Sequence, residues 1–407
     1  MRKILVSAYG CEPEKGSEQG VGWNWVLQMA RHNKVYVITK ANNQYSIEAN
    51  LPEELVHNIE FYYYDTAKLI KKFKNKAKGL YFYYFCWQIG IVPIIRQIIK
   101  LHNPNYTMHL TFGSLWMPTL LPFFNKPFIW GPIGGGDCEP EKLFKLLPLK
   151  QRLQAHLRLL LNKSVIINPF IRFVCSRSVA IICRTKNTGE IIPRKFKDKL
   201  HYCIETAIEP LKKREAKQNN SNNVVGVITT GRLTPSKNII TAIRAVADLK
   251  ELDYHYTIIG DGVDKERIKK EISRYDLQDR VTILNHVSRS EVIKNIQASD
   301  IFLFPSLREG GSWSLMEAMG VGLPVVCLNW SGMAMICNDK CAIRLSPHTP
   351  KQLQDQMRDA ISKLIKDSTL RNELGDSGYE LINERFNWSC KGEFIELLFN
   401  KIENRNE

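Results

Sequence analysis

The sequence predicts an α/β protein with two doubly wound domains, each built on a parallel sheet. Three observations support this fold class: strand-like and helical segments alternate along both halves, glycine-bearing loops follow several strands, and a polar stretch separates the halves. Such alternation is typical of parallel sheets covered by helices. Because these sheets bind ligands beyond the carboxyl ends of their strands, we expect the functional residues in those loops.

The first half, residues 1–208, opens with the pattern of a doubly wound unit. A strand at 3–9 leads into a glycine-rich loop at 10–22, and a helix is expected to begin near Trp23. The pattern at 166–175 and 179–183 fits neither element clearly. Apolar runs predict further strands at 35–39, 59–64, 106–110 and 128–130.

A charged and polar stretch, residues 209–222, contains a run of Asn and Ser and predicts an interdomain linker. The alternation then restarts in a second domain, residues 223–385. A helical tail is expected at 386–407. Apolar runs in the second domain predict strands at 224–229, 256–259, 281–284, 300–304, 324–328 and 343–345.

The stretch 301–326 has the order strand, glycine-bearing loop, short helix and second strand. Gly310 and Gly311 would let a ligand approach the backbone, and Ser312 suits the N-cap of a helix from Trp313 to about Met319. The first N–H groups of such a helix lack partners, and its dipole is positive there. We therefore expect an anion site at this helix start.

Glu309 precedes this helix and Glu317 lies inside it. Two carboxylates beside a phosphate would repel it if they had no other partner, so they predict a neutral, hydroxyl-rich group such as a sugar or ribose. The alternative is that Glu309 caps the helix and Glu317 is solvated. The residues of this stretch alone leave both interpretations open.

The composition is that of a globular protein, with 44% hydrophobic residues and a formal net charge of +16 among 407 residues. This charge suits nucleic acid, an anionic membrane surface or a phosphorylated small molecule. Because the chain shows no recognised nucleic-acid motif, we do not expect nucleic acid as a partner. The ten cysteines have no zinc-like spacing, and the N-terminus has no signal-peptide pattern, which predicts reduced thiols in a cytoplasmic protein.

Two basic segments with apolar neighbours indicate membrane contact. A lysine cluster at 68–78 precedes the apolar run 80–95, which is too short and interrupted to cross a bilayer. This pair is either an interfacial anchor or a solvated loop before a core helix. Residues 141–163 carry six Lys or Arg against one Glu, with leucines at helical spacing from Leu153. We expect peripheral contact with the anionic inner face of the cell membrane.

The motifs of both halves resemble those of the retaining nucleotide-sugar glycosyltransferases of family 4, which have the two-domain GT-B fold. In the second half the matching segments are GRLTPSK (231–237), IIGDG (258–262), Glu309 with Glu317, and VGLPVV (321–326). In the first half, CEPEKGSEQGVGW (11–23), HLTFGS (109–114) and WGPIGGG (130–136) are similar to a branch found in bacterial surface-polysaccharide and lipopolysaccharide assembly. The resemblance implies two domains that face each other across a cleft.

The resemblance also implies roles for individual residues. Arg232 and Lys237 would stabilise the charge on the leaving diphosphate, Glu309 would lie by the transferred sugar, and His109 would lie near that sugar's distal hydroxyl. These four are the expected catalytic residues. Arg232, Lys237 and Glu309 also belong to the expected donor-binding set, whose other members are Gly20, Gly22, Gly231, Gly260, Gly262, His286, Val287, Gly310, Gly311, Ser312 and Glu317.

Within this set, Glu317 would bind the ribose and Gly20 and Gly22 would lie in a loop that faces the diphosphate. His286 and Val287 occupy the segment whose backbone meets the nucleobase, and His286 replaces the usual glycine. Lys237 and Glu309 are expected to be exposed in an open cleft. Glu18 and Lys15 are candidates for acceptor binding or for ordering their loop.

The resemblance thus implies a hexosyl-type transferase that acts with retention by front-face substitution and without a metal ion or other cofactor. A UDP-sugar is expected as donor ahead of a GDP-sugar, and a lipid-linked or membrane-borne saccharide as acceptor. Two alternatives remain open: a sugar-nucleotide epimerase of the same fold, and a basic nucleic-acid-binding protein.

Overall fold

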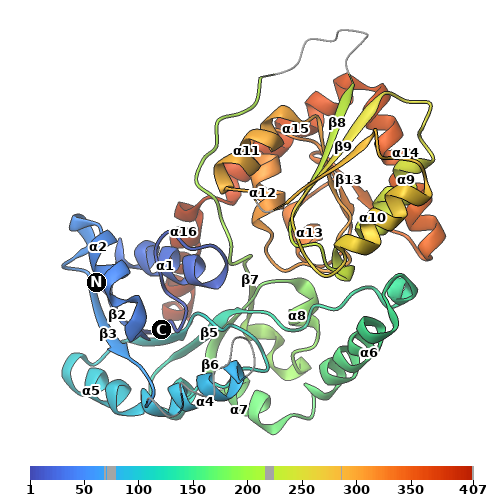
Figure 1. Cartoon of the computed structure of the whole chain (residues 1–407). Coiled ribbons are helices and arrows are strands. Elements are labelled where there is room, and N and C mark those ends of the chain that lie inside the picture. The colour runs from blue at the N-terminus through green and yellow to red at the C-terminus, as the bar shows by residue number, and fades with distance from the viewer. Residues whose placement is uncertain (68–69, 71–78, 216–223, 286, 406–407) are drawn as a thin grey trace. The chain divides into compact units, whose positions relative to one another are not determined.

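The computed structural model describes residues 1–67, 70, 79–215, 224–285 and 287–405, and it divides the chain into two compact units (Figure 1). Unit 1 contains Met1–Gly136, Asn162–Glu205 and Trp388–Glu407, and unit 2 contains Asp137–Leu161 and Thr206–Asn387. The lysine cluster at 68–78 and His286 lie outside the described residues. These units differ from the expected domains chiefly at 137–161, which we had placed with the first half.

Unit 1 is built on a parallel sheet with the strand order β3-β2-β1-β4-β5-β6-β7 in its described residues. The central strands are apolar on both faces because helices cover both, and Ile4, Leu5 and Val6 of β1 are fully buried. The strands are β1 (Lys3–Ser7), β2 (Lys34–Lys40), β3 (Ile59–Tyr64), β4 (Tyr106–His109), β5 (Phe128–Ile133), β6 (Ser178–Cys183) and β7 (Leu200–Tyr202).

The helices of unit 1 include one from the C-terminal end of the chain. This helix, α16 (Trp388–Glu403), packs against α1 (Ser17–Ala30), and Arg2 holds it through Glu396 at 2.8 Å and Glu403 at 2.7 Å (Figure 1). The other helices are α2 (Gln44–Asn50), α4 (Leu80–Gly90), α5 (Val92–His102), α7 (Pro169–Arg177) and α8 (Lys186–Glu190), with short 3-10 helices η1 (Ala41–Asn43), η2 (Glu53–Leu55), η3 (Leu121–Phe123) and η5 (Arg194–Lys199).

Unit 2 repeats the design with the parallel strand order β10-β9-β8-β11-β12-β13. Helices α9, α10 and α14 lie on one side of this sheet, and α11, α12 and α15 lie on the other (Figure 1). The strands are β8 (Val225–Thr230), β9 (Tyr254–Ile259), β10 (Val281–Leu284), β11 (Ile301–Phe304), β12 (Val325–Leu328) and β13 (Ala342–Leu345). The helices are η6 (Pro235–Lys237), α9 (Ile239–Ala247), α10 (Lys265–Arg274), α11 (Arg289–Ala298), α12 (Trp313–Gly320), α13 (Ser331–Ile336), α14 (Pro350–Lys366) and α15 (Ser368–Arg385).

Two other segments pack on unit 2. One contains η4 (Glu141–Leu146) and most of α6 (Leu149–Ser164). The other is the first part of the expected linker, where the Arg214 guanidinium lies 3.3 Å from the Asp300 carboxylate and both side chains are buried. Within the expected interdomain linker, residues 209–215 are therefore attached to unit 2 at Arg214.

The apolar run after the lysine cluster is longer than the sequence indicated. Together α4 and α5 form a helical stretch, Leu80–His102, that is long and apolar enough to cross a membrane by length and composition alone. The expectation that this run is too short is therefore wrong on length, because Pro93 lies in the first turn of α5, where proline is tolerated. Of its most apolar window, 39% is buried, and a core helix of a soluble protein can also pass this test of length and composition.

Candidate functional site

Two glycines in the turn after β9 shape the loop that presents Arg232 and Lys237. Gly260 and Gly262 have φ of +152° and +156°, which favours glycine. A Cβ on Gly260 would lie 1.9 Å from the Gly231 carbonyl oxygen, and one on Gly262 would lie 2.3 Å from that of Leu233. The turn after β9 therefore packs directly on the loop after β8, and its glycines set the position of that loop.

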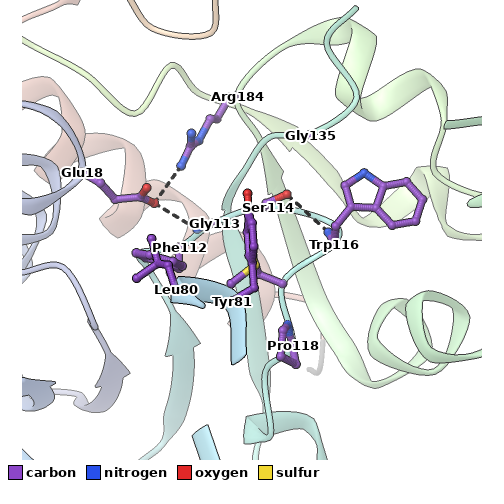
Figure 2. Close-up of a pocket in the computed structure, with 11 residues that line it drawn as sticks. Glu18, Leu80, Tyr81, Phe112, Gly113, Ser114, Trp116, Pro118, Gly135 and Arg184 are labelled. Carbon is purple, nitrogen blue, oxygen red and sulfur yellow. Dashed lines mark hydrogen bonds and ion pairs between the residues drawn. The ribbon is translucent and has the colours of Figure 1, made fainter. Parts of the chain in front are cut away.

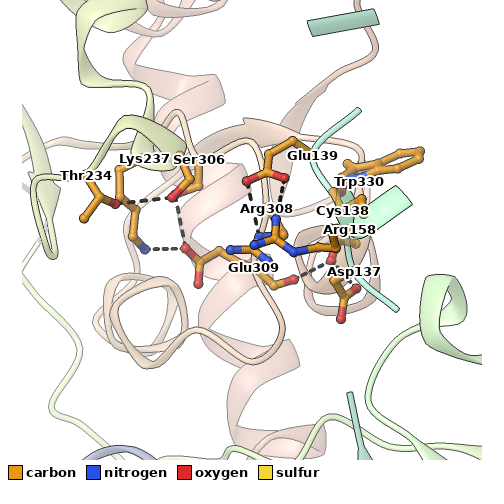
Figure 3. A network of polar contacts seen from close by, with 12 residues as sticks. Asp137, Cys138, Glu139, Arg158, Thr234, Lys237, Ser306, Arg308, Glu309 and Trp330 are labelled. Atoms are coloured by element: carbon orange, nitrogen blue, oxygen red, sulfur yellow. Dashed lines mark hydrogen bonds and ion pairs between the residues drawn. The ribbon is translucent and has the colours of Figure 1, made fainter. Parts of the chain in front are cut away.

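Lys237 and Glu309 form an ion pair at the carboxyl ends of β8 and β11 (Figure 3). The Ser306 hydroxyl donates to the same Glu309 oxygen at 3.3 Å, and the Lys237 ammonium lies 5.1 Å from the centroid of the Phe304 ring. Each side chain of the pair is only 18% exposed. The expectation that both groups are exposed is therefore wrong, because each covers the other.

Arg232 is exposed to solvent, whereas Lys237 is paired with Glu309. Within the described part of the chain, no hydrogen bond or ion pair engages the Arg232 side chain. The loop after β8 thus presents one cation that is already paired and one that is available to an anionic ligand.

The loop after Glu309 is fixed at both ends. Ser312 caps α12 by accepting a hydrogen bond from the Leu315 N–H at 3.4 Å, so the predicted N-cap is confirmed. Gly332 donates its N–H to the Glu309 carbonyl at 2.9 Å, and a Cβ there would lie 1.5 Å from the Gly310 carbonyl oxygen. Glycine at 332 is thus required for α13 to hold the loop that contains Gly310 and Gly311.

Glu317 is buried in α12, and its carboxylate accepts from Arg289, with Nε at 3.1 Å and Nη2 at 3.0 Å. Burial raises the pKa of Glu317, and Arg289 partly offsets this effect. The alternative in which Glu309 caps the helix and Glu317 is solvated is therefore wrong on both counts. Val287 lies half-buried just before α11.

A second polar network joins the segment 137–161 to the Glu309 loop (Figure 3). The buried Glu139 carboxylate pairs with Arg158 of α6 at 2.9 Å and with Arg308 at 3.5 Å. Trp330 adds a hydrogen bond from its indole N–H to the Cys138 carbonyl at 2.7 Å. Sequence reasoning missed these residues, because ion pairs between distant positions leave no local pattern.

In unit 1, His109 lies at the end of β4 in register with Ser7 of β1 and Trp130 of β5. Its ring is fully buried, and its nitrogens make no hydrogen bond of ordinary geometry within the described residues. Burial lowers the pKa of His109 to about 4, and the nearby Phe112 backbone and Glu18 offset this only partly. The imidazole is therefore neutral at neutral pH.

The loop expected at 10–22 is shorter than predicted, because α1 begins at Ser17. Gly20 and Gly22 therefore lie within a helix, and their expected place in a loop is wrong. A Cβ on Gly22 would lie 1.9 Å from the Gly10 carbonyl oxygen, so this glycine lets α1 pack against the end of β1. Gly22, which suggested a loop, instead allows close packing.

A cavity of about 550 Å³ lies beside this helix in unit 1 (Figure 2). The Glu18 carboxylate accepts from the Gly113 N–H at 3.1 Å and pairs with Arg184 at 3.3 Å, so Glu18 orders the loop after β4. Lys15 only approaches Glu12, at 3.9 Å. The cavity is lined by Glu18, Leu80, Tyr81, Phe112, Gly113, Ser114, Trp116, Met117, Pro118, Gly135 and Arg184.

Among the described residues, no group of three or more His, Cys, Asp or Glu side chains is placed to hold a metal ion. None of the ten cysteines, all of which the structure describes, forms a disulfide, and most are buried.

Residues 210–381, which include Arg232, Lys237, Glu309 and Glu317, match the family model described as glycosyl transferases group 1. The chain carries a glycosyltransferase group 1 domain. Curated relatives include the amylovoran biosynthesis glycosyltransferase AmsK of Erwinia amylovora, 33% identical over 153 residues, which cover 36% of this chain and 38% of that protein. The putative colanic acid biosynthesis glycosyltransferase WcaL of Escherichia coli is 33% identical over 149 residues, 35% of this chain and 37% of that protein. The matches thus span less than half the length of these relatives.

Solved structures resemble the whole chain at low identity. Sucrose-phosphate synthase from Thermosynechococcus elongatus has a TM-score of 0.66 at 16% identity and covers 100% of both chains. The lipopolysaccharide outer core galactosyltransferase WaaB has a TM-score of 0.64 at 14% identity and covers 98% of this chain and 99% of its own. HepE from Anabaena, solved with UDP and glucose, has a TM-score of 0.59 at 15% identity and covers 98% and 100%. Together with the two parallel sheets, these neighbours confirm the predicted GT-B fold class.

Replacing Glu139 with alanine should lower the folding stability of unit 2 by about 2 kcal/mol, because Arg158 and Arg308 would lose the buried carboxylate that they share. Urea unfolding followed by tryptophan fluorescence measures this change. Glu141→Ala is the matched control, since Glu141 is exposed two residues away. Equal stability of the two variants would show that the Glu139 pairs do not fix α6.

His109 should make the stability of unit 1 depend on pH. Because its pKa of about 4 lies below that of an exposed histidine, the unfolded chain binds the proton first as the pH falls. Stability is therefore lost below about pH 6.5, by roughly 2 kcal/mol at pH 5. His109→Gln should remove that part of the loss between pH 7 and pH 5, as measured by urea unfolding at both values.

His201 is the control, because its pKa is also lowered to about 4, chiefly by burial, and it titrates in the same window. His201→Gln should leave the His109 contribution in place. An identical pH dependence in His109→Gln and the unsubstituted protein would contradict a buried neutral imidazole.

Proposed function

We propose that this chain is a retaining glycosyltransferase that moves a hexose from a nucleotide-diphosphate sugar to a lipid-linked or membrane-borne saccharide in bacterial surface-polysaccharide assembly. The Lys237–Glu309 pair carries the proposal, because it places a cation and a carboxylate together at strand ends of a group 1 domain. A diphosphate requires a cation, and the hydroxyls of a sugar donate hydrogen bonds to a carboxylate.

The charges of the pair suggest how it would work. A bound diphosphate would draw Lys237 and the open Arg232 toward its oxygens, so both cations would stabilise the negative charge that develops on the leaving group. Glu309, released from Lys237, would accept hydrogen bonds from the sugar hydroxyls. Two cations and the α12 start would make a metal ion unnecessary, so we propose a metal-independent reaction without a cofactor.

Retention follows from front-face substitution. The bond from the anomeric carbon to the diphosphate breaks, the acceptor oxygen attacks from the same face, and the departing phosphate oxygen takes the acceptor proton. Glu309 is then an electrostatic partner of the positively charged sugar and forms no covalent bond with it. Glu317 would accept from the ribose hydroxyls in place of Arg289.

The relatives support the substrate classes without fixing them. AmsK is named for amylovoran biosynthesis and WcaL for colanic acid biosynthesis, and HepE was solved with UDP. We therefore propose a UDP-sugar ahead of a GDP-sugar, and a location at the cytoplasmic face of the cell membrane. The unit 1 cavity is the proposed acceptor site, because Tyr81, Phe112 and Trp116 offer aromatic faces and Glu18 and Arg184 offer hydrogen bonds.

The test is incubation with a panel of UDP- and GDP-sugars, with and without a lipid extract of a polysaccharide-producing bacterium. We expect slow nucleotide release alone, faster release with the acceptor, and an α-linked product from an α-linked donor by NMR. An isomerised donor without acceptor would indicate an epimerase instead. If no sugar nucleotide of the panel is bound or turned over, the proposal is wrong.

A further inference from the structure

Helix α6 has its apolar face turned away from the protein. Leu149, Leu153, Leu157, Leu160 and Leu161 recur at helical spacing and are 44–70% exposed. An ordinary surface helix buries its leucines and exposes its charges. In the part of α6 that belongs to unit 2, the leucines are exposed instead, whereas Arg152 and Arg158 are half-buried.

The inward face of α6 is held by polar contacts. The Arg152 guanidinium donates to the carbonyls of Phe144, Lys145 and Leu147 at 3.1–3.3 Å, and Arg158 pairs with Glu139 (Figure 3). Ala155, between them, is almost fully buried. Because these contacts fix the rotation of the helix, the leucines cannot turn inward without breaking buried ion pairs and hydrogen bonds.

Three observations favour lipid as the occupant of this exposed face. Lys150 and Lys163 are exposed near the ends of the leucine face. This face therefore fits a partner that has negative charges next to an apolar phase, as an anionic bilayer has. By length and composition alone, α6 and the following helix α7 are together apolar enough for a broken membrane segment. In addition, a second helix, α4, exposes Tyr81, Phe82, Phe85 and Ile89, the aromatic and aliphatic residues that settle at a bilayer boundary.

We propose that the leucine face of α6, Leu149 to Leu161, is a docking surface for an anionic bilayer, on which the helix lies in the plane of the interface. The leucines would enter the acyl boundary while Lys150 and Lys163 contact headgroup phosphates. The Arg158–Glu139–Arg308 contacts join this helix to the residue before Glu309. Lipid contact is therefore made by an element anchored beside the candidate donor site.

Cosedimentation with vesicles of phosphatidylglycerol and phosphatidylcholine tests the docking surface. The full chain should bind these vesicles, and Leu153→Glu/Leu157→Glu should weaken the partition coefficient about tenfold or more. The matched control is Leu101→Glu/Leu397→Glu, which replaces two equally exposed leucines on α5 and α16 and adds the same charge. The control should bind within about twofold of the unsubstituted protein.

Two further measurements keep the outcome decisive. Leu153→Ala/Leu157→Ala preserves helix propensity and charge, so it should still weaken binding if the apolar contact matters, with unchanged melting temperature. Sedimentation equilibrium without lipid shows whether a second copy covers the face. Equal vesicle binding by all variants, equal loss in the control, or a dimer that only the α6 variants dissolve would overturn the proposal. Vesicle binding needs no turnover, so such a result would leave the proposed reaction untouched.

Discussion

Lys237→Ala should slow nucleotide release from the preferred donor sugar by about 100- to 1,000-fold, the usual effect of removing one preorganised group that stabilises developing charge. Lys237 is held at the end of β8 by the glycine-shaped loop, and its ammonium is largely shielded from water. Once drawn from Glu309 to the diphosphate, the ammonium would stabilise the negative charge that develops on the leaving group. Steady-state release of UDP, followed with a coupled assay, gives the ratio of kcat/KM values.

The stability of Lys237→Ala should change little, by about 1 kcal/mol, because Glu309 keeps the Ser306 hydroxyl and can take up water. Lys213→Ala is the control, since Lys213 also forms an ion pair in unit 2, with Asp376 at 2.9 Å. It should retain full activity. Equal rates for Lys237→Ala and Lys213→Ala would remove Lys237 from the proposed catalytic set.

Asp300→Ala should cost about 3–5 kcal/mol of folding stability, because it leaves the buried Arg214 guanidinium without its carboxylate. Burial lowers the pKa of Arg214, and Asp300 opposes that shift. The same carboxylate also accepts the Gly226 N–H at 2.8 Å, so its removal frees a backbone donor at the start of β8. Urea unfolding of the full chain, fitted for the unit 2 transition, measures the loss.

Asp376→Ala is the matched control for Asp300→Ala. Its partner Lys213 is exposed, so we expect a loss of less than about 1 kcal/mol. A loss of similar size in both variants would mean that Arg214 finds another partner or water, and that residues 209–215 are not fixed by this pair.

Most of the strand framework could be predicted from sequence, because each buried parallel strand is a short apolar run that a polar loop ends. The run Val281–Leu284 is predicted to the residue, and the Ser312 cap follows from its place before a helical pattern. Local chemistry decides these features, so a local pattern reveals them.

The errors have a common physical cause, which is close packing between segments distant in sequence. Gly22 suggested a loop, yet it lies in α1, where the Gly10 carbonyl leaves no room for a Cβ. Glu139 binds α6 to the Glu309 loop through Arg158 and Arg308, and nothing near Glu139 in the sequence marks that contact. Lys237 was expected to be exposed, because its partner Glu309 lies 72 residues away and no local pattern indicates their contact.

The candidate site shows the same division. Motifs predicted the loops that present Arg232, Lys237 and Glu309, whereas the place of Gly20 and Gly22 and the present partners of the charged groups could not be predicted. The Glu317 carboxylate is paired with Arg289, and the Glu309 carboxylate is paired with Lys237. In the proposed reaction, hydroxyls of the ribose and of the transferred sugar would replace these cations as partners. The described structure therefore shows these carboxylates satisfied by the protein itself.

Calorimetric titration with UDP tests the central claim most directly, because it asks whether this group 1 domain holds a nucleoside diphosphate through its basic loop. The account predicts that UDP binds the unsubstituted chain and that Arg232→Ala/Lys237→Ala weakens binding about 100-fold or more, while Lys213→Ala leaves it unchanged. UDP and GDP that bind no better to the unsubstituted chain than to the double variant would contradict it.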